Sequence, residues 1–518
     1  MKSVKFVMCC LVALSLLFAG CSPTERDSAK KSQPDASPKP VVASKSNSMA
    51  ETKNVSAQEY LANSIKMEAG QPAKDQIQDL YDEMDFQRAV QAYIWATPFV
   101  SFAAFERGWK EDFGESMSRR VVFETSATPE LTVYTANNTS IYTVGFFDLK
   151  KDGPVVLDVP PETLGGFNNH WQYPLQDVGP FGPDKGRGGK YLVLPPNYKG
   201  AVPAGYHVVR ADTYKVLYLL RGLPKGADTS FAIATIKNIQ TYPLSQAANP
   251  PKTEYFNVSG KVASTIFPTD ETYFDVLAKE IQYEIVRPQD KAILGMLAPM
   301  GIEHGKAFSP DARVKGILKR AAKVGDAMSR VIAYSSRSPK RIFYDGDSQW
   351  EKIFLTKLST FETDTYLDVD ARVTYSHQAF FTANGMVLKL VGKGSQYLAT
   401  YKDAQGEWLD GGHNYSLHLD AGIPAKNFWS IMVYDTETRS MILNGKKNDV
   451  GKDGGSDLVK NTDGSIDLYF GPAAPAGKES NWIKTVPGKG FFMYFRAYGP
   501  TEKYFDKSWK LNDVTKIK

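Results

Sequence analysis

Short strand-like segments, bounded by glycine and proline, fill two separate stretches of this 518-residue chain and constrain its fold more than any other feature. The first stretch runs from about residue 121 to 222, and the second from about residue 374 to the end. Runs of β-branched and aromatic residues in both stretches predict short strands, among them 155–159, 191–194, 466–470 and 491–496. Many short strands with frequent turns favour antiparallel sandwiches or jelly rolls over a parallel α/β sheet.

Two other stretches have helical periodicity. Apolar spacing over Asp75–Trp95 predicts a helix that Pro98 ends or kinks. Helices are also predicted over 270–334, where Asp270 is a candidate N-cap and 309–311 is a helix start signal. An apolar stripe follows this signal at Val314, Ile317, Leu318, Ala321, Val324, Met328 and Ile332, and we interpret it as core packing. The predicted fold is α+β, mainly β: two β-sandwich, jelly-roll-like domains with a helical segment between and an N-terminal helix.

The first 21 residues have the features of a secretion signal, with Lys2 and Lys5 before a short apolar run. The end of this run, Leu17 to Cys21, resembles the bacterial lipobox, which implies cleavage before Cys21 and lipidation of its thiol. The alternative is a secreted protein cut nearby by the ordinary signal peptidase. Ser22 rather than Asp follows the cysteine, which favours anchoring to the outer membrane, facing the periplasm, in a Gram-negative host.

Composition and charge exclude several kinds of chemistry and argue against one kind of partner. All three cysteines lie within the first 21 residues, which excludes disulfide and zinc-thiolate chemistry in the rest of the chain. The charges, 62 basic against 57 acidic residues, are too balanced to predict a nucleic-acid partner. We expect a signal peptide at 1–20, a disordered tether at 21–70, a β domain with a leading helix at 71–225, a largely helical segment at 226–345 and a second β-sandwich at 346–518.

Several motifs resemble a pair of known families. Gly411-Gly412-His413-Asn414-Tyr415, 427–430, Tyr434-Asp435 and Arg496-Ala497-Tyr498-Gly499-Pro500 look like the DUF1214 domain. Upstream, 137–142, 158–160 and 176–177 resemble the companion DUF1254 domain, which often has Asn-Asp-Thr where this chain has Asn138-Thr139. The resemblance implies two sandwiches with a helical segment between them, and it implies no chemistry.

Polar loops rich in amides and aromatic rings supply the candidate site residues. An acid pair, one protonated and one ionised, would suit glycan or amide hydrolysis, so the candidate catalytic residues are Glu124, Asp177 and His170. Aromatic rings and amides suit sugar binding, and the candidate substrate-binding residues are Asn137, Asn138, Tyr142, Trp171 and Arg496. The alternatives are turns for the Asn-rich segments, core packing for the aromatic residues, and a structural ion pair between Arg496 and Asp435.

No established motif of nucleotide, nicotinamide or zinc-protease chemistry is present. We predict no cofactor and no metal site, and the alternative is calcium at acidic, glycine-rich loops, none of which has the complete spacing of a calcium loop. Two hypotheses remain for a protein held at the membrane by a lipid anchor. One is a hydrolase acting on glycans or amide-linked glycoconjugates, and the other is a non-catalytic ligand-binding or structural envelope protein.

Overall fold

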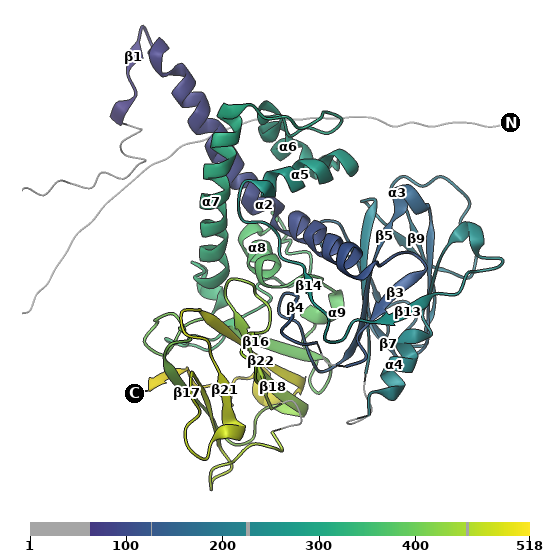
Figure 1. Cartoon of the computed structure of the whole chain (residues 1–518), viewed down its shortest axis with the longest axis vertical. Helices are drawn as coiled ribbons and strands as arrows, with labels where there is room; N and C mark the ends of the chain where they lie inside the picture. Colours follow the sequence, from purple (N-terminus) through teal and green to yellow (C-terminus); the bar gives the residue numbers. More distant parts are fainter. Residues whose placement is uncertain (1–62, 126, 224–227, 452–454, 518) are drawn as a thin grey trace, which may run out of the picture. The chain divides into compact units, whose positions relative to one another are not determined.

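The computed structural model describes residues 63–125, 127–223, 228–451 and 455–517 (Figure 1). The predicted signal peptide, Cys21 and most of the predicted tether lie outside these residues. The predicted domain boundaries stay predictions. No described helix is long and apolar enough to cross a membrane.

The first strand-rich stretch forms a sandwich of two four-stranded sheets. One sheet has the order β5 (Ile141–Asp148), β11 (Lys215–Gly222), β7 (Thr163–Asn169) and β8 (Pro174–Val178). The other has the order β10 (His207–Arg210), β9 (Gly189–Leu194), β6 (Val155–Val159) and β12 (Gln240–Pro243). Phe147 and Val216 of the first sheet share one buried core with Val155 and Val193 of the second, which confirms the predicted sandwich.

The second strand-rich stretch also forms a sandwich. Its larger sheet has the order β15 (Glu351–Lys352), β16 (Ser395–Thr400), β22 (Phe491–Pro500), β18 (Ala425–Asp435) and β19 (Asp449–Val450). Its smaller sheet has the order β21 (Trp482–Lys484), β20 (Ile466–Gly471), β17 (Asn414–Leu419) and β23 (Thr515–Ile517). Leu398 and Phe495 of the larger sheet share a buried core with Leu417 and Leu468 of the smaller one.

Strand β22 is buried on both of its faces. Alternation along the strand gives Phe491, Met493 and Phe495 to the sandwich core. Phe492 and Tyr494, on the opposite face, belong to a different buried cluster that includes Tyr375. The outer face of this sheet is therefore covered by other parts of the chain, and side chains on it lie in the interior.

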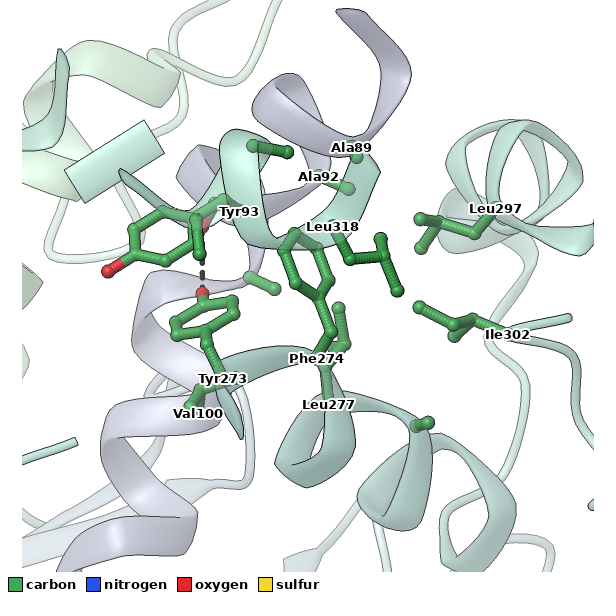
Figure 2. Packing of buried hydrophobic residues seen from close by; sticks show 14 of the residues in the cluster. Ala89, Ala92, Tyr93, Val100, Tyr273, Phe274, Leu277, Leu297, Ile302 and Leu318 are labelled. Carbon is green, nitrogen blue, oxygen red and sulfur yellow. Dashed lines mark hydrogen bonds between the residues drawn. The ribbon is translucent and has the colours of Figure 1, made fainter. Parts of the chain in front are cut away.

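Helices make a third core. Its main elements are α2 (Ile77–Phe113), α5 (Thr272–Tyr283), α6 (Lys291–Leu297), α7 (Ala312–Tyr334) and α8 (Val369–Gln378). Figure 2 shows Tyr273 of α5 pointing toward the backbone of α2, where its hydroxyl donates to the Tyr93 carbonyl at 2.7 Å. Gly325 of α7 permits close packing here, because a Cβ at this position would lie 2.6 Å from the Tyr93 ring.

Smaller elements connect these three parts. The short helices are α3 (Leu149–Asp152), α4 (Ser230–Lys237), α9 (Asn384–Val387) and α10 (Glu502–Phe505). Two parallel pairs of short strands join β3 (Arg119–Val122) to β13 (Glu254–Asn257) and β4 (Leu131–Thr132) to β14 (Ala263–Ser264). Two further short strands are β1 (Met67–Glu68) and β2 (Gln71–Pro72).

Three local predictions need correction. Helix α2 runs well past Pro98 to Phe113; the Thr97 hydroxyl donates to the Tyr93 carbonyl, and the Gln172 amide donates to the carbonyl of Pro98 itself. Thr374 lies in helix α8, and strands of the second sandwich lie on both sides of this helix in the sequence, because β15 precedes it. Met328, which we assigned to the core stripe, is 44% exposed. The predicted start signal at 309–311 lies just before α7, and the N-cap is Asp311 rather than Ser309, because the Asp311 carboxylate accepts from the Val314 amide at 2.8 Å.

Candidate functional site

The outer face of the larger C-terminal sheet carries a compact group of polar and aromatic side chains. Tyr397 of β16 and Ser430 of β18 lie directly opposite Arg496 of β22 in the strand register. Two residues further along β22, Tyr498 lies opposite Phe428, and their rings stack with centroids 4.1 Å apart. The register therefore places one arginine and several ring hydroxyls on adjacent strands of one sheet face.

A loop of the other β domain lies on this face. Its Thr135 carbonyl accepts from Arg496 Nη2 at 3.1 Å, and its Asn137 amide donates to the Tyr498 hydroxyl at 2.9 Å. The carbonyl next to Thr135, that of Ala136, accepts from the Tyr434 hydroxyl at 2.9 Å. Thr135 has a φ of 39°, in the left-handed region, where a residue other than glycine is strained. The contacts with the sheet hold this loop in its strained form.

A second arginine comes from the N-terminal sandwich. Arg221 of β11 lies directly opposite Tyr142 of β5. The guanidinium is close enough to Tyr142, Tyr397 and Tyr498 for these groups to raise the pKa of Arg221, against the effect of burial. Strands from both sandwiches therefore contribute to one group, which we call the Arg221–Arg496 cluster. It consists of Asn137, Tyr142, Arg221, Tyr397, Arg496 and Tyr498.

The cluster has positive charge and lacks an acidic counterpart. Among the described residues, neither Arg221 nor Arg496 forms an ion pair with a carboxylate, and Arg496 Nη1 has no hydrogen-bond partner. Three tyrosine rings lie 5.4 to 5.9 Å from the Arg496 guanidinium, and they help to keep it charged. Burial works to lower the pKa of Arg496, but neighbouring tyrosines raise it overall.

The cluster extends from the interior to the surface. Arg496 is only 3% exposed. Asn137, Tyr142, Arg221 and Tyr397 are half-buried.

Four of the residues predicted to bind substrate come from this region. Asn137, Tyr142 and Arg496 belong to the cluster, and Asn138 is buried in the loop that covers it. Sequence reasoning missed Arg221, Tyr397 and Tyr498. A signal for Arg221 existed, because it interrupts the apolar strand Lys215–Gly222 with a charge.

The predicted catalytic acids have other partners. The Glu124 carboxylate pairs with Lys237 at 2.6 Å. The buried Asp177 carboxylate accepts from the backbone amides of Asn384 and Gly385 at 2.9 and 2.7 Å. Burial raises the pKa of Asp177, and the two amides oppose this effect. Each acid has a structural partner, and the pairing of Glu124 with Asp177 in catalysis stays a prediction.

The predicted catalytic His170 is fully buried. Its ring lies between Phe99 and Phe102, with centroids 4.0 and 4.5 Å away, and its Nδ1 lies 2.9 Å from a Glu284 oxygen. The adjacent Trp171 is 3% exposed and stacks on Phe99 at 4.2 Å, within the helical core. These contacts favour the core alternative for Trp171, and a catalytic role for His170 stays a prediction.

The structural ion pair that we expected between Arg496 and Asp435 is not formed. Asp435 lies further along the sheet, and its carboxylate pairs with Lys489 at 2.9 Å. The register explains the difference, because Asp435 of β18 lies opposite Phe491, far along β22 from Arg496. In the described part of the chain, no group of three or more His, Cys, Asp or Glu residues is arranged to hold a metal ion.

Comparison with known families agrees with the two-sandwich fold. Residues 119–243 match the model of a family described as a protein of unknown function, DUF1254, and residues 394–502 match that of a second such family, DUF1214. The chain therefore carries a DUF1254 domain followed by a DUF1214 domain. Each match covers strands of one sandwich, and both matches confirm the resemblance seen in the sequence. No curated protein matches the chain.

Two solved structures are similar. The VPA0106 protein from Vibrio parahaemolyticus has 18% sequence identity and a TM-score of 0.51, covering 84% of this chain and 100% of that protein. An uncharacterized protein from Burkholderia cenocepacia has 12% identity and a TM-score of 0.37, covering 86% of this chain and 98% of that one. At 18% identity, the likeness to the Vibrio protein concerns the fold alone.

Proposed function

We propose that this protein binds a small anionic molecule at the Arg221–Arg496 cluster, with a carboxylate group of the ligand placed against the two arginines. The observation that carries the proposal is the absence of an ion pair for either arginine within the described residues, together with the unpartnered Nη1 of Arg496. A buried guanidinium without a counter-charge is costly, and a bound carboxylate removes this cost through charge-assisted hydrogen bonds.

The neighbouring groups favour a ligand that also carries hydroxyl groups. Tyr142, Tyr397 and Asn137 present hydroxyl and amide groups on the half-buried side, and the stacked rings of Phe428 and Tyr498 lie beside them. Sugars with a carboxylate, such as uronic acids, combine these features. The proposal places this binding at the cell envelope, on the strength of the lipobox-like sequence that ends at Cys21.

Binding has more support than hydrolysis. The three residues predicted to be catalytic, Glu124, Asp177 and His170, each have a partner that gives a structural reason for their presence. Cleavage of a glycan or an amide-linked glycoconjugate therefore stays a prediction. The two arginines support binding of an anionic ligand that is not cleaved.

A matched pair of probes separates charge recognition from sugar recognition. Glucuronate and glucose differ at one carbon, which carries a carboxylate in the first and a hydroxymethyl group in the second. We expect glucuronate, and not glucose, to raise the unfolding temperature of the purified protein. Acetate, benzoate and inorganic phosphate extend the panel to other anions. If none of these anions binds at millimolar concentration, the proposal is wrong.

Two arginine variants test whether the ligand binds at the Arg221–Arg496 cluster. Arg221→Gln removes the half-buried charge, and we expect binding to weaken about tenfold or more because a charge-assisted hydrogen bond contributes about 1.5–3 kcal/mol. Arg210→Gln is the control, because Arg210 is an exposed arginine on β10 of the same sandwich. Equal losses in both variants would indicate attraction to the general surface charge and would contradict the proposed site.

A further inference from the structure

A third arginine without an ion pair is buried in a different place. Arg439 is 1% exposed and lies after β18, on the loop that leads to β19. Its Nε donates to the His377 carbonyl at 3.2 Å, and its Nη1 donates to the Glu437 carbonyl. Its Nη2 has no hydrogen-bond partner. Among the described residues, no carboxylate forms an ion pair with Arg439, so the charge is held by neutral groups only.

The side chain next to Arg439 is also unsatisfied. His377 of α8 is fully buried, and neither of its ring nitrogens has a hydrogen-bond partner. Burial lowers the pKa of His377 well below its usual value, and the charges of Arg439 and Arg330 add to this effect. The ring is therefore neutral and offers one N–H donor. Unpartnered buried polar groups of this kind are rare in native proteins and indicate a missing partner.

Aromatic rings surround the two groups. The Arg439 guanidinium lies 4.8 Å from the Tyr134 ring and 5.0 Å from the Phe267 ring. The His377 ring lies 6.2 Å from Phe267 and 5.5 Å from Tyr334. Arg439 and His377 thus share Phe267 as a neighbour, in an interior where a charge is poorly screened.

The backbone at this point is strained. Arg439 has a φ of 59°, and its carbonyl accepts at 2.7 Å from the amide of Thr135, which has a φ of 39°. Two strained residues bonded to each other cost free energy that the surroundings must offset. Two acids of this region have other partners, because Asp435 pairs with Lys489 and Asp326 pairs with Arg330.

We propose that Arg439 and His377 form a fully buried site for a small monovalent anion, either a halide ion or the carboxylate of a molecule the size of formate. The unpartnered N–H groups of Arg439 Nη2 and the N–H of the His377 ring are donors, and an anion accepts from both. A water molecule would satisfy the donors but would leave the charge of Arg439 uncompensated. This site is separate from the Arg221–Arg496 cluster and does not depend on the function proposed for that cluster.

Bromide diffraction tests the proposal directly. Crystals of the full protein are grown in sodium bromide, and anomalous scattering locates the bromide ions. We expect a peak within hydrogen-bond distance of Arg439 Nη2 in the wild type and no such peak in Arg439→Met. The control is Arg337→Met, which removes a surface arginine with an 89% exposed side chain and should leave the peak in place. Peaks confined to the surface, or a water molecule at Arg439, would exclude a halide from the site, and together with the absence of a formate effect in the second measurement they would overturn the proposal.

A second measurement does not depend on the variant folding. The unfolding temperature of the wild type is followed as chloride or formate replaces a bulky sulfonate at constant ionic strength. We expect a saturable rise of about 2 °C or more, because an anion that binds only the folded state stabilises it. A rise with formate alone that Arg221→Gln retains identifies a carboxylate site at Arg439, and a rise with both anions that Arg221→Gln retains identifies a site for either anion. Equal unfolding temperatures in all three salts would contradict the proposal.

Discussion

The assignment of His170 to a structural role leads to a sharp prediction for its partner Glu284. The buried Glu284 carboxylate lies 2.9 Å from His170 Nδ1 through Oε1, which also accepts from the Lys215 amide at 2.9 Å. Its second oxygen, Oε2, accepts from the Tyr214 amide at 2.6 Å. Both carboxylate oxygens are needed, because backbone donors approach each of them.

Glu284→Gln keeps the size of the side chain and replaces one acceptor oxygen with an NH₂ group. In either orientation of the new side-chain amide, its NH₂ group faces a backbone N–H, that of Lys215 or that of Tyr214. Loss of one charge-assisted hydrogen bond and burial of an unsatisfied N–H lower the free energy of unfolding by about 2–4 kcal/mol. This is a large part of the about 5–15 kcal/mol that stabilises a typical protein.

Chemical denaturation followed by tryptophan fluorescence measures the effect, and Trp171 lies next to His170 in the sequence as a local probe. Glu303→Gln is the matched control, since Glu303 is half exposed and pairs loosely with Lys306 at 3.7 Å. We expect this control to stay within about 0.5 kcal/mol of the wild type.

A double-mutant cycle with His170→Phe isolates the contact between His170 and Glu284. If the two residues act as one structural unit, their effects are non-additive by about 1–3 kcal/mol. An additive result, or a Glu284→Gln variant as stable as the wild type, would refute the structural role. In that case His170 would again be a candidate for catalysis.

Three further predictions concern other parts of the fold. Tyr498→Phe removes the acceptor of the Asn137 amide and should lower the free energy of unfolding by about 1 kcal/mol, measured by denaturation in urea. The pKa of His377 is lowered by burial, so the unfolded chain takes up a proton near its usual value of 6.5 while the folded protein does not. Stability should therefore fall as the pH decreases below about 6.5, and His377→Asn should flatten this slope in urea denaturation repeated at several pH values. Gly451→Ala should lower the free energy of unfolding by about 1–3 kcal/mol in thermal melts, because Gly451 has a φ of 84° and a new Cβ would lie 2.5 Å from the Trp429 ring.

The sequence predicted which stretches of the chain form the two sandwiches and the helices better than it predicted where individual elements end. Strand alternation identified both sandwiches, because each strand carries its own pattern of apolar residues. The end of α2 was missed, since Pro98 normally breaks a helix, and the hydrogen bond from the distant Gln172 to the Pro98 carbonyl is invisible to a local pattern.

The candidate site was predicted in part. Asn137, Tyr142 and Arg496 were identified because polar groups next to strands, or a charge within an aromatic strand, are unusual. These residues come together only because the two sandwiches pack against each other. That packing brings together residues as distant in sequence as Tyr142 and Arg496. The pairing of the predicted acids stays a prediction, since the sequence contains many carboxylates and no local signal shows which ones are paired.

Buried charges without partners were the least predictable feature. The sequence around Arg439 reads as a polar turn, and His377 reads as an ordinary surface or core histidine. Only the packing of α8 against the loop after β18 shows that both are enclosed and unsatisfied.

Calorimetric titration of glucuronate tests the central claim most directly, with the wild type, Arg221→Gln and Arg210→Gln measured side by side. Recognition of a carboxylate at the Arg221–Arg496 cluster predicts binding to the wild type and to Arg210→Gln, and affinity at least about tenfold weaker for Arg221→Gln. Glucose should give no heat of binding in any of the three proteins. Equal affinity of Arg221→Gln and the wild type for glucuronate would contradict the account.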